Sequence, residues 1–241
     1  MIIKLVRHGE SEANIGLVDG ATIGNCNIPL TPKGFNDADM AGETLGGTFI
    51  EDALLYCSPY LRTRQTIKGI IAGAGYDDCP FNRHVIGKVY EDPRLREVDW
   101  GYQTYAAYDD CLNDLKDVHG PFYTRRTDGE SCADCYDRIS TFLESMWRQF
   151  RKKDTSNVLI VSHGLTIRTF VMRFMHLQVE QFGLLRNPKN CDIITISNEE
   201  EAHGENEVQW KCGKWGVSGL RLRDELTTLF GTEKNSGFAN S

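Results

Sequence analysis

Short apolar runs alternate with longer amphipathic stretches along this chain, and the alternation predicts its secondary structure. Each apolar run has the length of a strand and no polar alternation, which is typical of strands buried on both faces. These runs occupy residues 2–6, 53–57, 157–162 and 192–196. The stretches with helical spacing occupy residues 31–48, 60–72, 130–152 and 164–177. Strands alternating with helices of this length need crossover connections, so we expect an α/β fold with three α/β/α layers and a mostly parallel central sheet flanked by helices.

The chain shows no interdomain linker, because prolines are few and no Ser/Gly-rich or single-charge run divides it. We expect one domain over residues 1–232 and a polar tail over residues 233–241. Residues 76–128 are the least regular part of the sequence. This segment is predicted to be an insertion at one edge of the sheet that caps the functional site.

Composition narrows the class of partner. The net charge is −7, which argues against nucleic acid or an anionic membrane, because clusters of Lys and Arg bind those partners. A small anion can still bind in a local cationic pocket. The sequence leaves open whether the protein is a homodimer.

Location and cofactors follow from the same composition. No stretch approaches the roughly 20 apolar residues that span a bilayer, and the first residues lack the features of a secretory signal. We therefore expect a cytoplasmic protein whose eight cysteines are reduced and packed as small apolar side chains. Cys132 and Cys135 have the spacing of a zinc or redox pair, but no second pair completes a tetrahedral site. We expect no metal and no other cofactor.

Two His-Gly pairs each follow directly on an apolar run, His8-Gly9 after the first and His163-Gly164 after residues 157–162. In a parallel sheet the carboxyl ends of the strands share one edge, where ligands collect. Glycine allows the backbone to approach a ligand closely, and the helix after Gly164 would offer N–H groups to an anion. A lone histidine at a strand end is usually structural. Two such pairs at one edge favour a functional site.

Two arginines supply candidate cations at this edge. Arg7 precedes His8, where its charge would depress the pKa of the imidazole and its guanidinium could fork onto phosphate oxygens. Arg62 lies in the first turn of the helix that follows residues 53–57. Arg64 lies two residues further, about 200° around that helix. It is therefore expected to be an ordinary solvated charge.

These residues fall into an ordered series of motifs that resembles the histidine phosphatase superfamily, which includes the cofactor-dependent phosphoglycerate mutases. The series runs from residue 5 to about residue 170. Each motif alone is weak, but the ordered set is specific. In chain order the motifs are Arg7-His8-Gly9-Glu10-Ser11 with Asn14, Pro29-Leu30-Thr31 with Gly34, Ser58-Pro59-Tyr60-Leu61-Arg62 with Gln65-Thr66, Leu95-Arg96-Glu97 with Gly101, Gly129-Glu130-Ser131, and Ser162-His163-Gly164.

The resemblance implies a phosphoglycerate mutase-like fold and a role for each matching position. His8 would be the nucleophile that forms a phosphohistidine, with its other ring nitrogen donating to a backbone carbonyl. Arg7, Arg62 and His163 would clamp the phosphoryl oxygens. Asn14 would add a neutral donor, and the backbone at Gly164 would lie against the phosphate. Glu97 would be the general acid and then the base for water, a role worth about 10²–10⁴ in rate.

The residues alone identify the acid less firmly. Glu97 stands in a run with four acidic residues, and Asp99 would share its face of an extended segment. A surface charge run is the plainer interpretation of that stretch. Only the resemblance selects Glu97.

The sequence favours hydrolysis over phosphate transfer between substrates. The mutases of this family carry a Glu-Arg-His-Tyr-Gly block, whereas this chain has Glu97-Val98-Asp99-Trp100-Gly101. Two stretches look more like small phosphatase-type members of plants and fungi: Asp92-Pro93-Arg94-Leu95-Arg96-Glu97 and Asn187-Pro188-Lys189-Asn190-Cys191. We expect a phosphatase acting on a small phosphorylated metabolite or on a broad range of them. The alternatives are a mutase-type phosphotransferase, an inactive scaffold member and, least favoured because the histidines lack ligand spacing, a zinc hydrolase.

Substrate recognition is expected in residues 98–128, the part of the insertion that would overhang the site. As a hypothesis, Arg125 and Arg126 read a second anionic group on the substrate. An ordinary surface role is the alternative for every candidate. The candidate contacts are Tyr102, Tyr105, Tyr123, Arg125 and Arg126.

Overall fold

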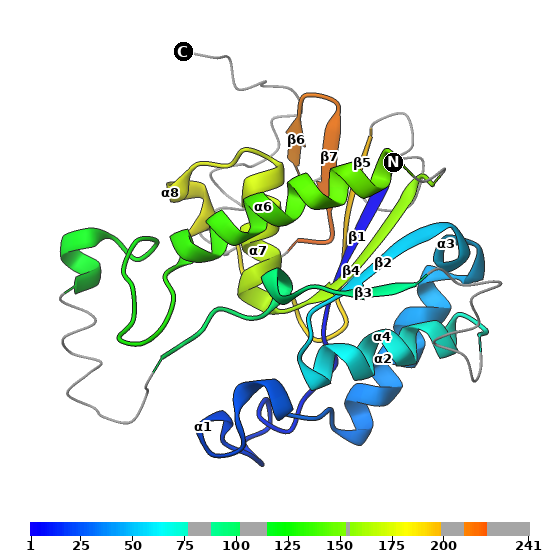
Figure 1. The fold of residues 1–241 in the computed structure, drawn as a ribbon, viewed down its shortest axis with the longest axis horizontal. Coiled ribbons are helices and arrows are strands. Elements are labelled where there is room, and N and C mark those ends of the chain that lie inside the picture. Colours follow the sequence, from blue (N-terminus) through cyan, green and yellow to red (C-terminus); the bar gives the residue numbers. More distant parts are fainter. Residues whose placement is uncertain (77–87, 102–114, 153–154, 199–209, 221–241) are drawn as a thin grey trace.

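The computed structural model describes residues 1–76, 88–101, 115–152, 155–198 and 210–220 (Figure 1). Its centre is a seven-stranded sheet in the order β3-β2-β4-β1-β5-β7-β6. The strands are β1 (Ile2–Arg7), β2 (Ala53–Cys57), β3 (Val89–Glu91), β4 (Asn157–Ser162), β5 (Ile193–Asn198), β6 (Trp210–Cys212) and β7 (Trp215–Ser218). Strands β3, β2, β4 and β1 run parallel, while β5, β7 and β6 are antiparallel additions. The predicted mostly parallel sheet is therefore confirmed in its core.

Helices cover both faces of this sheet, which confirms the three-layer prediction (Figure 1). On one face, α6 and α7 pack onto a core that includes Leu5 and Ile160. On the other, α2, α3 and α4 pack onto Val6 and Val161. The helices are α1 (Gly20–Ile23), α2 (Pro32–Leu45), α3 (Gly47–Asp52), α4 (Leu61–Gly73), α6 (Cys132–Phe150), α7 (Gly164–Phe174) and α8 (Val179–Phe182), with short 3-10 turns at Asn25–Asn27 and Pro93–Leu95.

The helix predicted over residues 31–48 is wrong at its end. α2 begins as its sequence indicates, with the Thr31 side chain accepting from the Gly34 N–H and Pro32 in the first turn. It ends at Leu45, because Gly46 adopts φ 77°, and a separate helix α3 starts at Gly47. A glycine in this left-handed region breaks a helix at little cost.

Strand register brings the two His-Gly pairs to one edge of the sheet. Arg7 of β1 lies opposite Ser162 of β4 in the parallel pairing. His8 and His163 therefore leave adjacent strands side by side, and the His8 N–H donates to the Ser162 carbonyl at 2.9 Å. This confirms that both histidines lie at the carboxyl ends of neighbouring strands.

Two glycines let α2 approach the first histidine loop at backbone distance. A Cβ on Gly9 would lie 2.4 Å from the Gly34 carbonyl oxygen, and one on Gly34 would lie 2.1 Å from the Glu10 carbonyl oxygen. The Thr31 hydroxyl also donates to the Glu10 carboxylate at 2.9 Å. The motif around residues 29–34 therefore supports the loop that carries His8.

The segment 76–128 is only partly an insertion. Its residues 89–91 form β3, which pairs in parallel with β2 as the edge strand of the sheet. A three-residue strand has too little pattern to be predicted from sequence. The tail at 233–241 lies outside the described residues. Among the helices that the structure describes, none combines the length and the apolar character needed to cross a bilayer.

Candidate active site

His8 lies at the centre of the site and is held in one orientation. It is 4% exposed, and its Nδ1 lies 2.8 Å from the Gly9 carbonyl oxygen. Nδ1 must donate in this contact, because a carbonyl only accepts, so the neutral ring carries its lone pair on Nε2. Burial first, and the Arg62 charge second, hold the pKa of His8 well below 6.5. The site therefore presents a neutral imidazole with a bare Nε2.

His163 packs edge-on against His8, with ring centroids 5.2 Å apart. It is fully buried, and its Nε2 lies 2.8 Å from the Ser58 hydroxyl oxygen. Its Nδ1 is buried without a hydrogen-bond partner among the described residues. Burial, followed by the charge of Arg62, holds the pKa of His163 well below its ordinary value. An unpartnered buried ring nitrogen beside the His8 ring is available to a ligand.

Both predicted arginines converge on this pair, and each is anchored by one guanidinium nitrogen. Arg7 donates from Nη1 to the Pro188 carbonyl at 2.7 Å, while its Nε is buried without a partner in the described structure. Arg62, which is 5% exposed, donates from Nη1 to the Asn25 carbonyl at 2.6 Å. Burial lowers the pKa of Arg62 to about 10, so it stays charged near neutral pH. A guanidinium fixed at one corner keeps further N–H groups for a bidentate anion.

Glu97 is placed in the same site by contacts with the start of α7. Its Oε1 accepts from the backbone N–H of Thr166 at 3.3 Å and lies 3.2 Å from the Thr166 hydroxyl oxygen. The Thr166 hydroxyl lies 2.7 Å from the Arg96 carbonyl oxygen, and Ser162 Oγ donates to the Leu95 carbonyl at 2.7 Å. The charge of Glu97 also acts on both arginines, raising their pKa values against the effect of burial.

The structure separates Glu97 from its rival Asp99. Asp99 is exposed and its Oδ1 accepts from the Gly101 N–H at 2.9 Å, which forms a local turn. Glu130 holds this loop by accepting from the Asp99 N–H at 3.2 Å and pairing with Arg96. The Gly-Glu-Ser motif that precedes α6 therefore holds the loop that carries Glu97 and Asp99.

Asn14 is linked to the site by Asn190, a residue to which the sequence analysis gave no role. Its Oδ1 accepts from the Ser11 N–H at 3.0 Å and from Asn190 Nδ2 at 3.1 Å. Asn190 also donates to the His8 carbonyl at 2.9 Å. Both contacts use the side-chain oxygen of Asn14, which is an exposed residue, and leave its amide nitrogen for other partners. Asn190 stands in the phosphatase-like stretch Asn187–Cys191 and just before β5, which runs antiparallel to β1 and begins in the same region.

Gly164 begins α7 and is buried. A Cβ there would lie 3.1 Å from the Asn187 side chain, so the glycine permits close contact with the loop that precedes β5. The predicted anion site at this helix N-terminus is partly occupied by the protein itself, since the Thr166 N–H binds the Glu97 carboxylate. A helix N-terminus favours such an anion.

The predicted substrate contacts stay untested. Tyr102 and Tyr105 lie outside the described residues, and Tyr123 is 58% exposed. Arg125 pairs with Asp134 in the first turn of α6, and the Arg126 guanidinium lies 3.6 Å from the centre of the Trp100 ring. Arg64 pairs with Glu91 at 3.1 Å on the surface. It is half-exposed, as expected for a residue outside the site.

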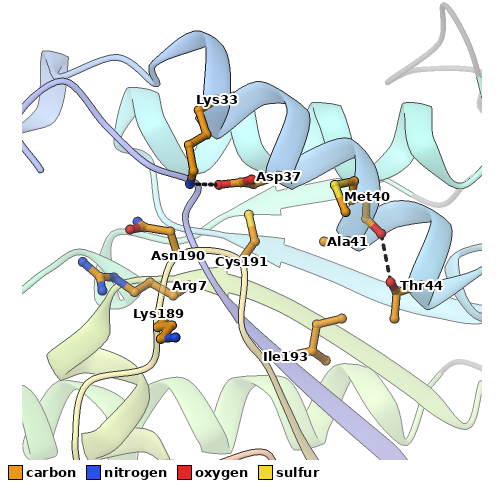
Figure 2. A pocket seen from close by; sticks show the side chains of 10 residues that line it. All are labelled: Arg7, Lys33, Asp37, Met40, Ala41, Thr44, Lys189, Asn190, Cys191 and Ile193. Carbon is orange, nitrogen blue, oxygen red and sulfur yellow. Dashed lines mark hydrogen bonds and ion pairs between the residues drawn. The ribbon is translucent and has the colours of Figure 1, made fainter. Parts of the chain in front are cut away.

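A pocket of about 520 Å³ opens beside the site, between α2 and the loop before β5 (Figure 2). It shares Arg7 and Asn190 with the site, and its far wall is formed by α2 side chains including Met40 and Thr44. Neither His8 nor His163 lines it.

The described cysteines are free thiols. Cys57 and Cys135 are buried in the two cores, which confirms for them the predicted apolar role. Cys26 is exposed. Within the described ranges, no group of three or more His, Cys, Asp or Glu side chains is arranged to hold a metal ion.

Comparison with known proteins gives a consistent result. The sequence pattern of the histidine phosphatase superfamily (branch 1) matches residues 3–211. A phosphoglycerate mutase-like protein of Arabidopsis thaliana is 38% identical over 251 residues, covering 95% of this chain and 86% of the relative. A broad-range acid phosphatase of Saccharomyces cerevisiae is 26% identical over 287 residues, covering 83% of this chain and 86% of the relative.

Solved structures share the fold. The alpha-ribazole phosphatase from Shigella flexneri superposes with a TM-score of 0.62 at 22% identity, covering 82% of this chain and 91% of that one. At 22% identity this similarity supports the shared fold and nothing more.

Proposed function

Because the chain belongs to the histidine phosphatase superfamily, we propose that it is a phosphomonoester hydrolase that works through a phosphohistidine on His8. One observation carries this proposal: the buried His8 ring donates from Nδ1 to the Gly9 carbonyl and so presents a bare Nε2 beside two arginines. A neutral nucleophile and fixed cations are what attack on a phosphate dianion requires.

In the first step His8 Nε2 attacks phosphorus, the N–P bond forms and the bond from phosphorus to the substrate oxygen breaks. The leaving alkoxide takes a proton from Glu97, which enters this step as the acid. Arg7 and Arg62 neutralise the charge that builds on the phosphoryl oxygens, and His163 binds the same oxygens.

In the second step a water molecule gives its proton to the Glu97 carboxylate and attacks phosphorus. The O–P bond forms, the N–P bond breaks, and the lone pair returns to Nε2. The sum is one phosphomonoester and one water converted to alcohol and inorganic phosphate.

We propose a small phosphorylated metabolite, or a range of them, as substrate. The yeast relative is named a broad-range acid phosphatase, which supports hydrolysis. Relatives named 2,3-bisphosphoglycerate-dependent phosphoglycerate mutase also match this chain, so mutase chemistry is the second candidate. The departure at Val98-Asp99-Trp100 from the mutase block favours hydrolysis. We place this activity in the cytoplasm, where the free thiols would stay reduced.

Hydrolysis of an aryl phosphate by wild-type protein and by the His8→Ala variant tests the proposal. We expect turnover by the wild type without a phosphoglycerate primer, and at least a thousandfold less from His8→Ala, about the size of effect seen when a nucleophile is removed. Turnover retained by His8→Ala would overturn it. Conversion between 2- and 3-phosphoglycerate faster than phosphate release would favour the mutase. No turnover of any phosphomonoester would favour the inactive scaffold.

A further inference from the structure

Ser58 is placed to control the second histidine rather than to meet the substrate. The residue is fully buried directly after β2, and its hydroxyl oxygen lies 2.8 Å from His163 Nε2. The same oxygen accepts from the backbone N–H of Tyr60 at 3.4 Å. The hydroxyl therefore has one neighbour that can only donate and one that can do either.

The direction of the proton follows from this pair of neighbours. A serine hydroxyl has a single proton, and among its described contacts His163 Nε2 is the only acceptor. If Nε2 were protonated instead, a fully buried hydroxyl proton would have no acceptor there, which costs about as much as a lost hydrogen bond. The hydroxyl thus donates to Nε2, and the neutral ring must carry its own proton on Nδ1.

We propose that Ser58 is a positioning residue that fixes the Nδ1–H tautomer of His163 and so turns a neutral imidazole into a hydrogen-bond donor for the phosphoryl group. Nδ1 is the ring atom that is buried without a partner in the described structure. The ring packs against that of His8 at 5.2 Å. The inference rests on the proposed function for the identity of the acceptor.

A neutral donor suits the surroundings of this ring. The charged and titratable groups acting on His163 are Arg62, His8, Arg138 and Arg7, and each opposes a charge on the imidazole. An imidazolium would donate without help, but this environment disfavours it. The two histidines then share one tautomer for opposite purposes. His8 uses its bare Nε2 to attack, and His163 uses its Nδ1–H to bind.

The resting protein tests the tautomer without any substrate. Imidazole nitrogen NMR on protein with isotope-labelled histidines distinguishes protonated from bare ring nitrogens, and His163→Gln assigns the signals. We expect His163 to show a protonated Nδ1 and a bare Nε2 near neutral pH. A protonated Nε2, or an imidazolium, would overturn the proposal.

The Ser58→Ala variant tests the cause. We expect the His163 tautomers to become mixed, kcat/KM for an aryl phosphate to fall about tenfold, and inhibition by inorganic phosphate to weaken. The matched control is Thr169→Val, which removes another fully buried hydroxyl, one that donates to the Leu165 carbonyl at 2.9 Å. This control should leave the tautomer and the phosphate affinity unchanged.

An unaltered tautomer in folded Ser58→Ala would contradict the role of the hydroxyl. If that variant does not fold, the wild-type spectrum still shows which ring nitrogen of His163 carries the proton. A wild type with no phosphatase activity would defeat the proposed function, yet the tautomer would still be read, so the two failures are distinguishable.

Discussion

At the scale of single residues, burial sets the state of the histidines more than charge does. The sequence indicated Arg7 as the cause of a depressed pKa at His8. In the structure burial comes first, Arg62 second, and Arg7 contributes least of the causes that lower it. Sequence could identify His8, Arg7 and Arg62 because they lie in local motifs. It could not give Asn190 a role, because the contact with the His8 carbonyl spans 182 positions.

The role of the acid can be tested against the quality of the leaving group. Glu97→Gln should lower kcat for an alkyl phosphate by about 10²–10⁴, since its alkoxide must be protonated as it leaves. An aryl phosphate with a weakly basic leaving group should suffer far less. Steady-state kinetics on the two substrates measure the difference.

Asp99→Asn is the control for that measurement, because Asp99 is the neighbouring acid and is exposed in a local turn. It should leave both rates nearly unchanged. A larger effect of Asp99→Asn than of Glu97→Gln on the alkyl phosphate would transfer the acid's role to Asp99.

At the scale of elements, glycines let α2 and α4 pack with their backbones in contact. A Cβ on Gly42 would lie 2.1 Å from the Ile70 carbonyl oxygen, and one on Gly73 would lie 2.0 Å from that of Asp39. α4 carries Arg62 in its first turn, and α2 supports the His8 loop through Gly34. The pair therefore fixes two parts of the site relative to each other.

The cost of an added methyl group tests this contact. Gly42→Ala gains about 1 kcal/mol of helix propensity, yet we expect a net loss of about 1–3 kcal/mol in the free energy of unfolding, because backbone must move to admit the Cβ. Urea denaturation with an unchanged m-value measures it. Gly183→Ala is the control, since its Cβ would lie at an ordinary 3.4 Å from the Glu180 carbonyl oxygen. A stabilised Gly42→Ala would show that the two helices can separate freely.

The strands and helices around the site could be predicted because they are long and periodic. The break at Gly46 could not, since a glycine inside a helical pattern is often tolerated and only the φ of 77° shows the interruption. The β6–β7 hairpin was missed as well. Its strands are three and four residues long, and short strands leave little periodic signal.

At the scale of the whole molecule, the two buried histidines make folding depend on pH. The pKa values of His8 and His163 are lowered in the folded protein, so the unfolded chain binds more protons below about pH 6.5. Above that pH both histidines are neutral in the folded and unfolded states, and the fold keeps its full stability. As the pH falls from about 6.5 towards the pKa values of the histidines in the folded protein, that stability is lost. In that pH range each histidine lowers the free energy of unfolding by about 1.4 kcal/mol per pH unit.

Urea denaturation from pH 7 to pH 5 measures this slope. We expect the free energy of unfolding to fall as the solution becomes more acidic, and to fall less steeply in His163→Gln. The carboxylates with lowered pKa values, Asp92 and Asp134, weaken the fold only at lower pH, because their unfolded pKa is about 4. A free energy of unfolding that is flat or rises between pH 7 and pH 5 would contradict a neutral buried pair.

The central claim is that the phosphoryl group is transferred to His8 before water releases it. Trapping the phosphohistidine intermediate tests this claim most directly. The protein is mixed with a radiolabelled phosphomonoester, quenched in alkali within a turnover, digested and mapped by peptide. The account predicts an alkali-stable, acid-labile label on the peptide that contains His8, absent from His8→Ala and accumulating in Glu97→Gln when an aryl phosphate is the donor. Label on another residue, or turnover with no labelled protein under conditions where water attack is slow, would contradict it.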